Sequence, residues 1–94
     1  MTRPWFTYIL LCSDATLYTG VTTDITRRLQ EHNSQQGGAR YTRCRQPVQL
    51  VFVEQQASRS QACQRESAIK KLSAAAKRQL IGNQLTQDNV PPTP

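Results

Sequence analysis

Hydrophobic and polar positions follow the period of a β-strand in three parts of the chain. Residues 6–12 are almost continuously apolar, which predicts a strand covered on both faces. Residues 17–21 alternate between two faces, and the turn-forming residues 13–16 before them predict a hairpin. Residues 48–54 are rich in branched and aromatic side chains and predict a third strand.

The pattern changes to a helical period in three other segments. Asp24 to about Gln35 predicts a first helix, capped by Thr23 or Asp24. Residues 58–61 match a capping box and predict a second helix that ends at about residue 72. Residues 74–81 predict a short third helix that stops at a glycine.

The remaining segments lack a sustained period. Residues 37–47 contain two glycines, a proline and three arginines, and we expect a basic loop there. Residues 83–94 contain three prolines and few apolar side chains, which predicts a disordered tail after a single domain over residues 1–82. The order strand, strand, helix, strand, helix, helix predicts an α/β domain: a small, mainly antiparallel three-stranded sheet flanked by helices. The place of the third strand in that sheet stays open.

Length and composition restrict the class of protein. A chain of 94 residues makes one domain, and no run approaches the roughly 18 apolar residues of a membrane span. The cysteines Cys12, Cys44 and Cys63 are odd in number and lack the spacing of metal ligands, so we expect free thiols. We therefore expect a cytoplasmic protein that does not act at a membrane.

Positive charge is concentrated in the middle of the chain. The whole sequence carries a net charge of +6, and residues 24–78 contain eleven basic and four acidic residues. Such a surface attracts polyanions, nucleic acid above all. A basic surface without a dedicated ligand explains the charge equally well, so charge alone does not decide between them.

Two groups of side chains carry candidate chemistry. Arg28 and His32 are four residues apart and share a helical face, close to the end of the strand that holds Tyr18. A phenol, a guanidinium and an imidazole beside Gly20 can bind a phosphate. In the basic loop, Tyr41 lies among arginines, which favours contact with nucleic acid by phosphate pairing and base stacking, although a flexible connector remains the alternative.

These residues together resemble the GIY-YIG nuclease domain, most of all its small stand-alone bacterial members, the YhbQ-like proteins. The resemblance covers roughly residues 5–81. It is carried by Phe6-Thr7-Tyr8, Tyr18-Thr19-Gly20, Arg28 ten positions beyond Tyr18, His32 and the late helical Glu66. Only the tyrosine of the first motif matches, and Thr19 stands where the second motif usually has isoleucine or valine.

The resemblance implies a metal-dependent endonuclease that hydrolyses DNA phosphodiester bonds, in repair or processing of DNA. The implied catalytic residues are Tyr8, Tyr18, Arg28, His32 and Glu66. Glu66 would hold one Mg²⁺ or Mn²⁺, since a single carboxylate suits an ion that keeps much of its water. Arg28 would hold the phosphate with its planar fork. The general base stays open among Tyr8, Tyr18 and His32.

The expected partner is DNA, and a protein partner is also possible for such a small domain. The residues expected to contact nucleic acid are Gly20, Arg27, Arg40, Tyr41, Arg43, Arg45 and Lys70. Two alternatives remain beside the nuclease: a nucleic-acid-binding module that keeps the fold with little activity, and a subunit that needs a partner for activity. Each candidate residue taken alone has an ordinary structural role, so the prediction depends on their combination.

Overall fold

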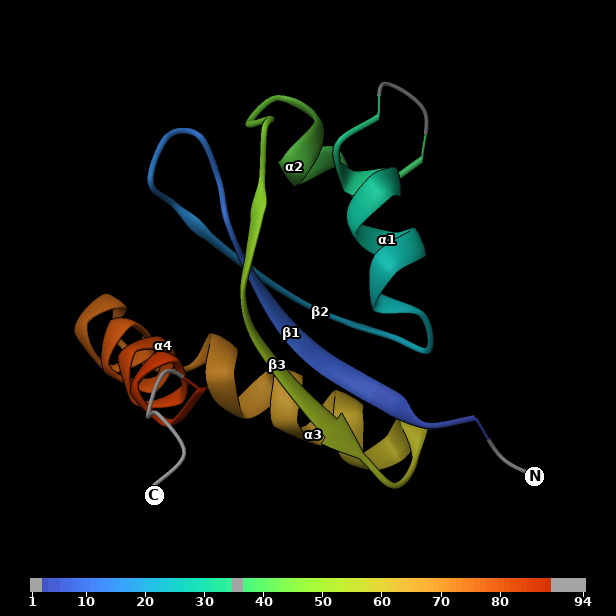
Figure 1. Cartoon of the computed structure of the whole chain (residues 1–94), viewed down its shortest axis with the longest axis vertical. Coiled ribbons are helices and arrows are strands. Elements are labelled where there is room, and N and C mark those ends of the chain that lie inside the picture. Colours follow the sequence, from blue (N-terminus) through green and yellow to red (C-terminus); the bar gives the residue numbers. More distant parts are fainter. Residues whose placement is uncertain (1–2, 35–36, 89–94) are drawn as a thin grey trace, which may run out of the picture.

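A three-stranded antiparallel sheet forms the centre of the fold (Figure 1). The computed structural model describes residues 3–34 and 37–88. The strands are β1 (Trp5–Leu11), β2 (Leu17–Thr22) and β3 (Gln49–Gln56), in the spatial order β2-β1-β3. Both β2 and β3 pair antiparallel with β1. The third strand, whose place the sequence pattern left open, therefore lies beside β1, and β2 and β3 are the edges of the sheet.

Four helices accompany the sheet: α1 (Ile25–His32), α2 (Arg40–Arg43), α3 (Arg59–Lys70) and α4 (Ala74–Asp88). The predicted fold class and the order of the main elements are confirmed. Two local predictions were wrong. The segment expected to be all loop contains the short helix α2, and α1 ends at His32 rather than near residue 35 because Asn33 caps it.

A side-chain hydrogen bond caps the N-terminus of α1, which follows β2, and another caps the N-terminus of α3, which follows β3. The Asp24 carboxylate accepts the Arg27 backbone N–H at 3.1 Å, which selects Asp24 over Thr23 as the cap of α1. The Ser58 hydroxyl accepts the Gln61 N–H at 3.2 Å at the start of α3, as the capping-box pattern predicts.

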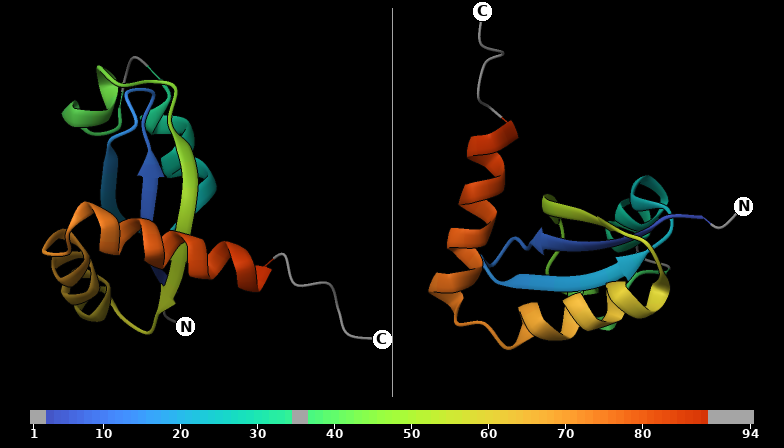
Figure 2. Two further views of the ribbon diagram at one scale, coloured as in Figure 1. Left: turned by 90° about the vertical axis from the view of Figure 1, so that its left-hand side faces the viewer. Right: turned by 90° about the horizontal axis from the view of Figure 1, so that it is seen from below.

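The alternation of β1 divides the core into two parts, one on each face of the sheet. Tyr8 and Leu10 pack toward α1, whereas Ile9 packs with Phe52 and Ile69 beneath α3 and α4. The helices α1 and α3 consequently lie on opposite faces (Figure 2). This arrangement matters for the site, because Arg28 and His32 come from one face and Glu66 comes from the other.

The helix predicted to stop at Gly82 instead continues to Asp88 as α4, so residues 83–88 are helical rather than the start of a disordered tail. A glycine inside a helix costs only about 1 kcal/mol, which neighbouring contacts can offset. Here the Gln84 amide bonds the exposed edge of β3: its Oε1 accepts the Val53 N–H at 3.0 Å, and its Nε2 donates to the Val53 carbonyl at 2.6 Å. The rest of the expected tail, residues 89–94, lies outside the described residues.

We expect Gln84→Ala to lower the free energy of unfolding by about 1–2 kcal/mol, because both backbone groups of Val53 lose a partner. Urea denaturation measures the change. Gln79→Ala, an exposed position on the same helix, is the matched control. Equal effects of the two substitutions would show that the contact with β3 contributes nothing to stability.

In the part of the chain that the structure describes, no helix is both long and apolar enough to cross a membrane. The three cysteines are free thiols, with Cys12 buried, Cys63 partly buried and Cys44 exposed.

Candidate active site

Tyr8 crosses from the central strand to the edge of the sheet, and Gly20 makes room for it. The two residues are paired across β1 and β2. A Cβ atom on Gly20 would lie 2.5 Å from the Tyr8 hydroxyl oxygen and 2.7 Å from Cζ. Any side chain at position 20 would therefore collide with the phenol. Gly20, expected to contact nucleic acid, is required here for packing.

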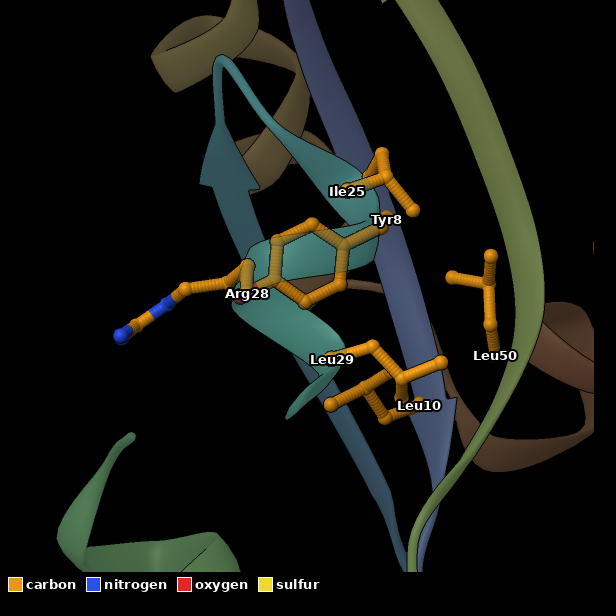
Figure 3. A pocket seen from close by; sticks show the side chains of 6 residues that line it. All are labelled: Tyr8, Leu10, Ile25, Arg28, Leu29 and Leu50. Carbon is orange, nitrogen blue, oxygen red and sulfur yellow. The ribbon is translucent and has the colours of Figure 1, made fainter. Parts of the chain in front are cut away.

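Arg28 and Tyr8 project to the same side of α1 and the sheet. Figure 3 shows Tyr8 leaving β1 beside Arg28, above apolar side chains that include Leu29 and Leu50. The Arg28 guanidinium donates to Glu31 Oε1 at 3.0 Å, and its side chain remains 30% exposed. This ion pair holds the pKa of Glu31 below its usual value. The arginine is thus held in place and is still reachable from solvent.

His32 is fully buried and joins Tyr8 to α2 through a line of hydrogen bonds. Its Nε2 lies 2.8 Å from the Tyr8 hydroxyl, and its Nδ1 lies 2.7 Å from Thr42 Oγ1. The Thr42 hydroxyl donates its proton to the Ala39 carbonyl at 2.9 Å. We assign the ring proton to Nδ1, which then donates to Thr42 Oγ1, because this 2.7 Å bond is shorter than the 3.4 Å contact in which the Ala39 N–H would donate to an unprotonated Nδ1. Nε2 is left to accept the proton of Tyr8.

The pKa values of this pair keep both members neutral at neutral pH. Burial lowers the pKa of His32 to about 4, and the nearby positive charge of Arg28 lowers it further, against an opposing effect of Glu31. Burial raises the pKa of Tyr8 to about 12, and the hydrogen bond from Arg28 only partly opposes this. Tyr8 therefore keeps its proton, and His32 is an unprotonated acceptor.

Tyr18 and Tyr41 extend the aromatic side of the site. The Tyr18 ring meets the edge of His32 with centroids 5.2 Å apart and stacks on Tyr41 at 5.9 Å. The Arg45 guanidinium lies 3.9 Å from the centre of the Tyr41 ring and also donates to Asp14 at 2.9 Å. Tyr41 is thus at the site as a stacked ring, and Arg45 is engaged within the protein.

Glu66 approaches the site from α3, on the other face of the sheet. Its negative charge is the weakest of the influences that act on the pKa of Tyr8, which burial dominates. Lys70 Nζ lies 3.4 Å from Glu66 Oε2, and the Glu66 side chain is 24% exposed. Contacts between described residues join Tyr8 with His32, Tyr18 with His32 and Tyr8 with Arg28, whereas Glu66 comes from α3 on the other face of the sheet. Lys70, expected to bind nucleic acid, pairs with Glu66.

The other residues expected to bind nucleic acid lie around this centre. Arg27 is 76% exposed and pairs with Glu31 at 3.4 Å. Arg40 and Arg43 are exposed on α2, the helix that also supplies Thr42.

Sequence reasoning missed Thr42 and the role of Gly38. Gly38 has a φ of 68°, and a Cβ there would lie 2.8 Å from the Glu31 carbonyl oxygen and 2.9 Å from the Cα of His32. Only glycine therefore lets this segment pass close to α1 and bring Thr42 to the imidazole. The glycine pair was the available signal, but it predicted only a basic loop.

The donor set fits a hydrated Mg²⁺ or Mn²⁺ and does not fit a site built entirely from protein ligands. Within residues 3–34 and 37–88, no group of three or more His, Cys, Asp or Glu side chains could hold an ion. Glu66 is a partly exposed single carboxylate, and Mg²⁺ keeps several water molecules and accepts phosphate oxygens as ligands. Glu66 is the residue that would hold such an ion.

Residues 4–79 match the family model described as the GIY-YIG catalytic domain, and the chain belongs to this family. The resemblance seen in the sequence is thereby confirmed. Within the family, the chain is similar to UPF0213 proteins. It is 59% identical to UPF0213 protein DP2720 of Desulfotalea psychrophila over 84% of this chain and 73% of that protein. It is 57% identical to a UPF0213 protein of Syntrophus aciditrophicus, over 81% and 87% of the two chains.

Two solved structures share the fold. The solution NMR structure of UPF0213 protein BH0048 from Bacillus halodurans has a TM-score of 0.55 and 42% identity, over 84% of this chain and 83% of that one. The solution NMR structure of EF2693 from E. faecalis has a TM-score of 0.58 and 39% identity, over 89% and 90% of the chains.

Proposed function

We propose that the protein is a metal-dependent endonuclease that hydrolyses DNA phosphodiester bonds, in repair or processing of DNA. The observation that carries the proposal is the buried Tyr8–His32 pair, in which Nε2 accepts the phenol proton, beside Arg28. Phosphodiester hydrolysis needs these parts: a route for the proton of water, a cation for the phosphate, and a ligand for a metal ion.

The residues divide these tasks as follows. Arg28 binds two non-bridging oxygens of the phosphate with its planar fork. The Tyr8 hydroxyl oxygen accepts a proton from the attacking water while passing its own proton to His32 Nε2, so the phenol never carries a full charge. The new bond forms between water oxygen and phosphorus, the bond to the leaving oxygen breaks, and the leaving oxygen takes a proton from a solvent water molecule. Tyr18 orients the water. Glu66 would hold a divalent ion, which when bound would supply positive charge for the phosphate.

This division explains why the altered pKa values suit the reaction. A tyrosine with a pKa near 12 cannot lose its proton to solvent at neutral pH, so it needs a neighbouring acceptor. His32, with a pKa near 4, is unprotonated at neutral pH and fills that role. Of the three candidates for the base that the sequence left open, this proposal assigns the final proton acceptor to His32.

We expect Glu66→Gln to reduce metal-dependent cleavage by about 10²–10³-fold, because the amide keeps the size of the side chain and removes its charge. Cleavage of single-stranded, duplex and branched DNA is measured with Mg²⁺ or Mn²⁺. Arg28→Lys should show a similar loss, since lysine lacks the bidentate fork. Glu54→Gln, which removes a carboxylate paired with Arg65, is the matched control. Cleavage that persists in the Glu66 variant would come from a contaminant and would contradict the proposal.

A nucleic-acid-binding module without activity is the second candidate. The observation in its favour is the raised pKa of Tyr8. The effect of burial on this pKa outweighs the opposing effect of Arg28, so the phenol stays protonated unless His32 accepts its proton. This candidate is supported by salt-dependent binding without any metal-dependent product. It fails if purified protein cleaves DNA and the Glu66 variant does not.

A further inference from the structure

A second hollow lies at the β2 side of the molecule, next to the candidate active site. It has a volume of about 300 Å³ and lies between the β1–β2 turn, Tyr41 and the first turns of α4, which contribute Lys77 and Arg78. We call it the α4 groove. The left view of Figure 2 shows α2 and the start of α4 on the same side of β2.

The α4 groove is connected to the candidate active site through two aromatic rings. Tyr41 lines the groove and stacks on Tyr18, with ring centroids 5.9 Å apart. Tyr18 in turn contacts His32. From Gly20 in β2 back to Thr16 just before it, four residue steps span about 13 Å, which equals roughly four stacked nucleotides and fewer in an extended strand. A strand with its phosphate at Arg28 can therefore reach the groove.

Among the residues that the structure describes, no ion pair neutralises Lys77 or Arg78 of the α4 groove. Among the described residues, the ion pairs of Asp14, Glu31, Glu54 and Glu66 are made with cations other than Lys77 and Arg78. The two basic side chains are thus available to phosphate groups, as a backbone-tracking groove requires.

An apolar hollow adjoins the α4 groove and shares Leu17 and Arg78 with it. It has a volume of about 210 Å³, and its other lining residues are Leu11, Val51 and Ile81. Apolar surface beside cations matches a nucleotide, which has an apolar base face and a charged phosphate. In a duplex the base faces are stacked inside, so only an unpaired base can enter such a hollow.

We propose that the α4 groove and its apolar hollow bind an unpaired stretch of the nucleic-acid substrate, a few nucleotides from the phosphate at Arg28. The substrate class is then a nucleic acid with a single-stranded segment next to the site of cleavage. Lys77 and Arg78 contact its phosphates, and the Leu17 region receives a base. This inference rests on the proposed function and adds the form of the substrate.

Binding without cleavage tests the proposal. Fluorescence anisotropy is measured with the full chain in EDTA, using a labelled blunt duplex and the same duplex with a six-nucleotide thymidine overhang. We expect the overhang to tighten binding about 5–10-fold. In the double variant Lys77→Ala/Arg78→Ala this preference falls below 2-fold, and the dependence of log K on log salt weakens by about 1.4 for two lost phosphate contacts.

The matched control is Arg59→Ala/Lys71→Ala, which removes the same charge from exposed positions outside the groove. We expect it to weaken both probes equally and to keep the preference. A wild-type protein without preference for the overhang would overturn the proposal, and so would an equal loss of preference in both double variants.

Crosslinking of the wild-type protein tests the proposal without any substitution that could unfold the protein. An overhang that contains photoreactive 5-iodouracil should crosslink to Tyr41 or Leu17, and crosslinks that are confined to α1 would overturn the proposal. Because these readouts need no cleavage, they remain informative if the protein proves to be inactive.

Discussion

Gly20→Ala is expected to abolish cleavage and to lower the free energy of unfolding by about 1–3 kcal/mol. The added methyl group would lie 2.5 Å from the Tyr8 hydroxyl oxygen and 3.2 Å from the Tyr18 ring. The phenol must then leave its place, and its hydrogen bond to His32 is lost. Urea denaturation measures stability, and the DNA cleavage assay measures activity.

A double substitution separates the collision from other effects of an alanine. In Gly20→Ala/Tyr8→Leu, the clashing ring atoms are absent, so we expect the stability cost to be smaller than the sum of the two single costs. Activity should stay absent, since the hydroxyl is gone. Gly82→Ala is the control, because a Cβ atom there has no neighbouring atom within 4 Å. We expect this substitution in α4 to raise the free energy of unfolding by about 0.5–1 kcal/mol. Additive effects at positions 8 and 20 would refute the steric explanation.

His32 should make the protein less stable as the pH falls below 6.5. Its pKa is lowered from 6.5 to about 4 in the folded state, so the unfolded chain binds the proton more readily. The stability contributed by neutral His32 is complete above pH 6.5 and is lost progressively as the pH falls toward 4. Between pH 7 and pH 4.5, this single group should lower the free energy of unfolding by about 2–3 kcal/mol.

Urea denaturation of the wild-type protein and of His32→Gln at several pH values measures this contribution. We expect the variant to lose most of the pH dependence in this window, since glutamine does not titrate. Glu31, whose pKa is lowered by the pairing with Arg28, loses its own contribution only below its usual value of 4.5. If both proteins showed the same pH dependence, His32 would not be the buried neutral group described above. Cleavage should fall about 10²–10⁴-fold in the variant, through loss of the proton acceptor.

Strand periodicity predicted the β1–β2 hairpin, and helical spacing brought Arg28 and His32 to one face, because both signals depend on nearby residues. The pairing of Tyr8 with Gly20 depends on the register of the hairpin, which alternation alone does not define. Thr42 was beyond reach because α2 is a four-residue helix without a period and is held by tertiary contacts with His32.

At the end of α4, a local sequence signal gave a wrong prediction because contacts distant in the sequence outweigh it. Gly82 predicted the end of a helix, but hydrogen bonds to β3, about thirty residues away in the chain, favour its continuation. Arg45, expected to contact nucleic acid, also contacts Asp14 and Tyr41 and so stabilises the turn that places Tyr41, an intramolecular role that the sequence did not predict.

The amide of Gln84 also has a consequence for self-association. An unoccupied outer strand is a template on which another polypeptide can add itself, and chains of this kind can grow into aggregates. On β3, one position where an incoming chain would form its hydrogen bonds is already occupied by Gln84 at Val53. We therefore expect this side chain to protect the protein from fibril formation as well as from unfolding.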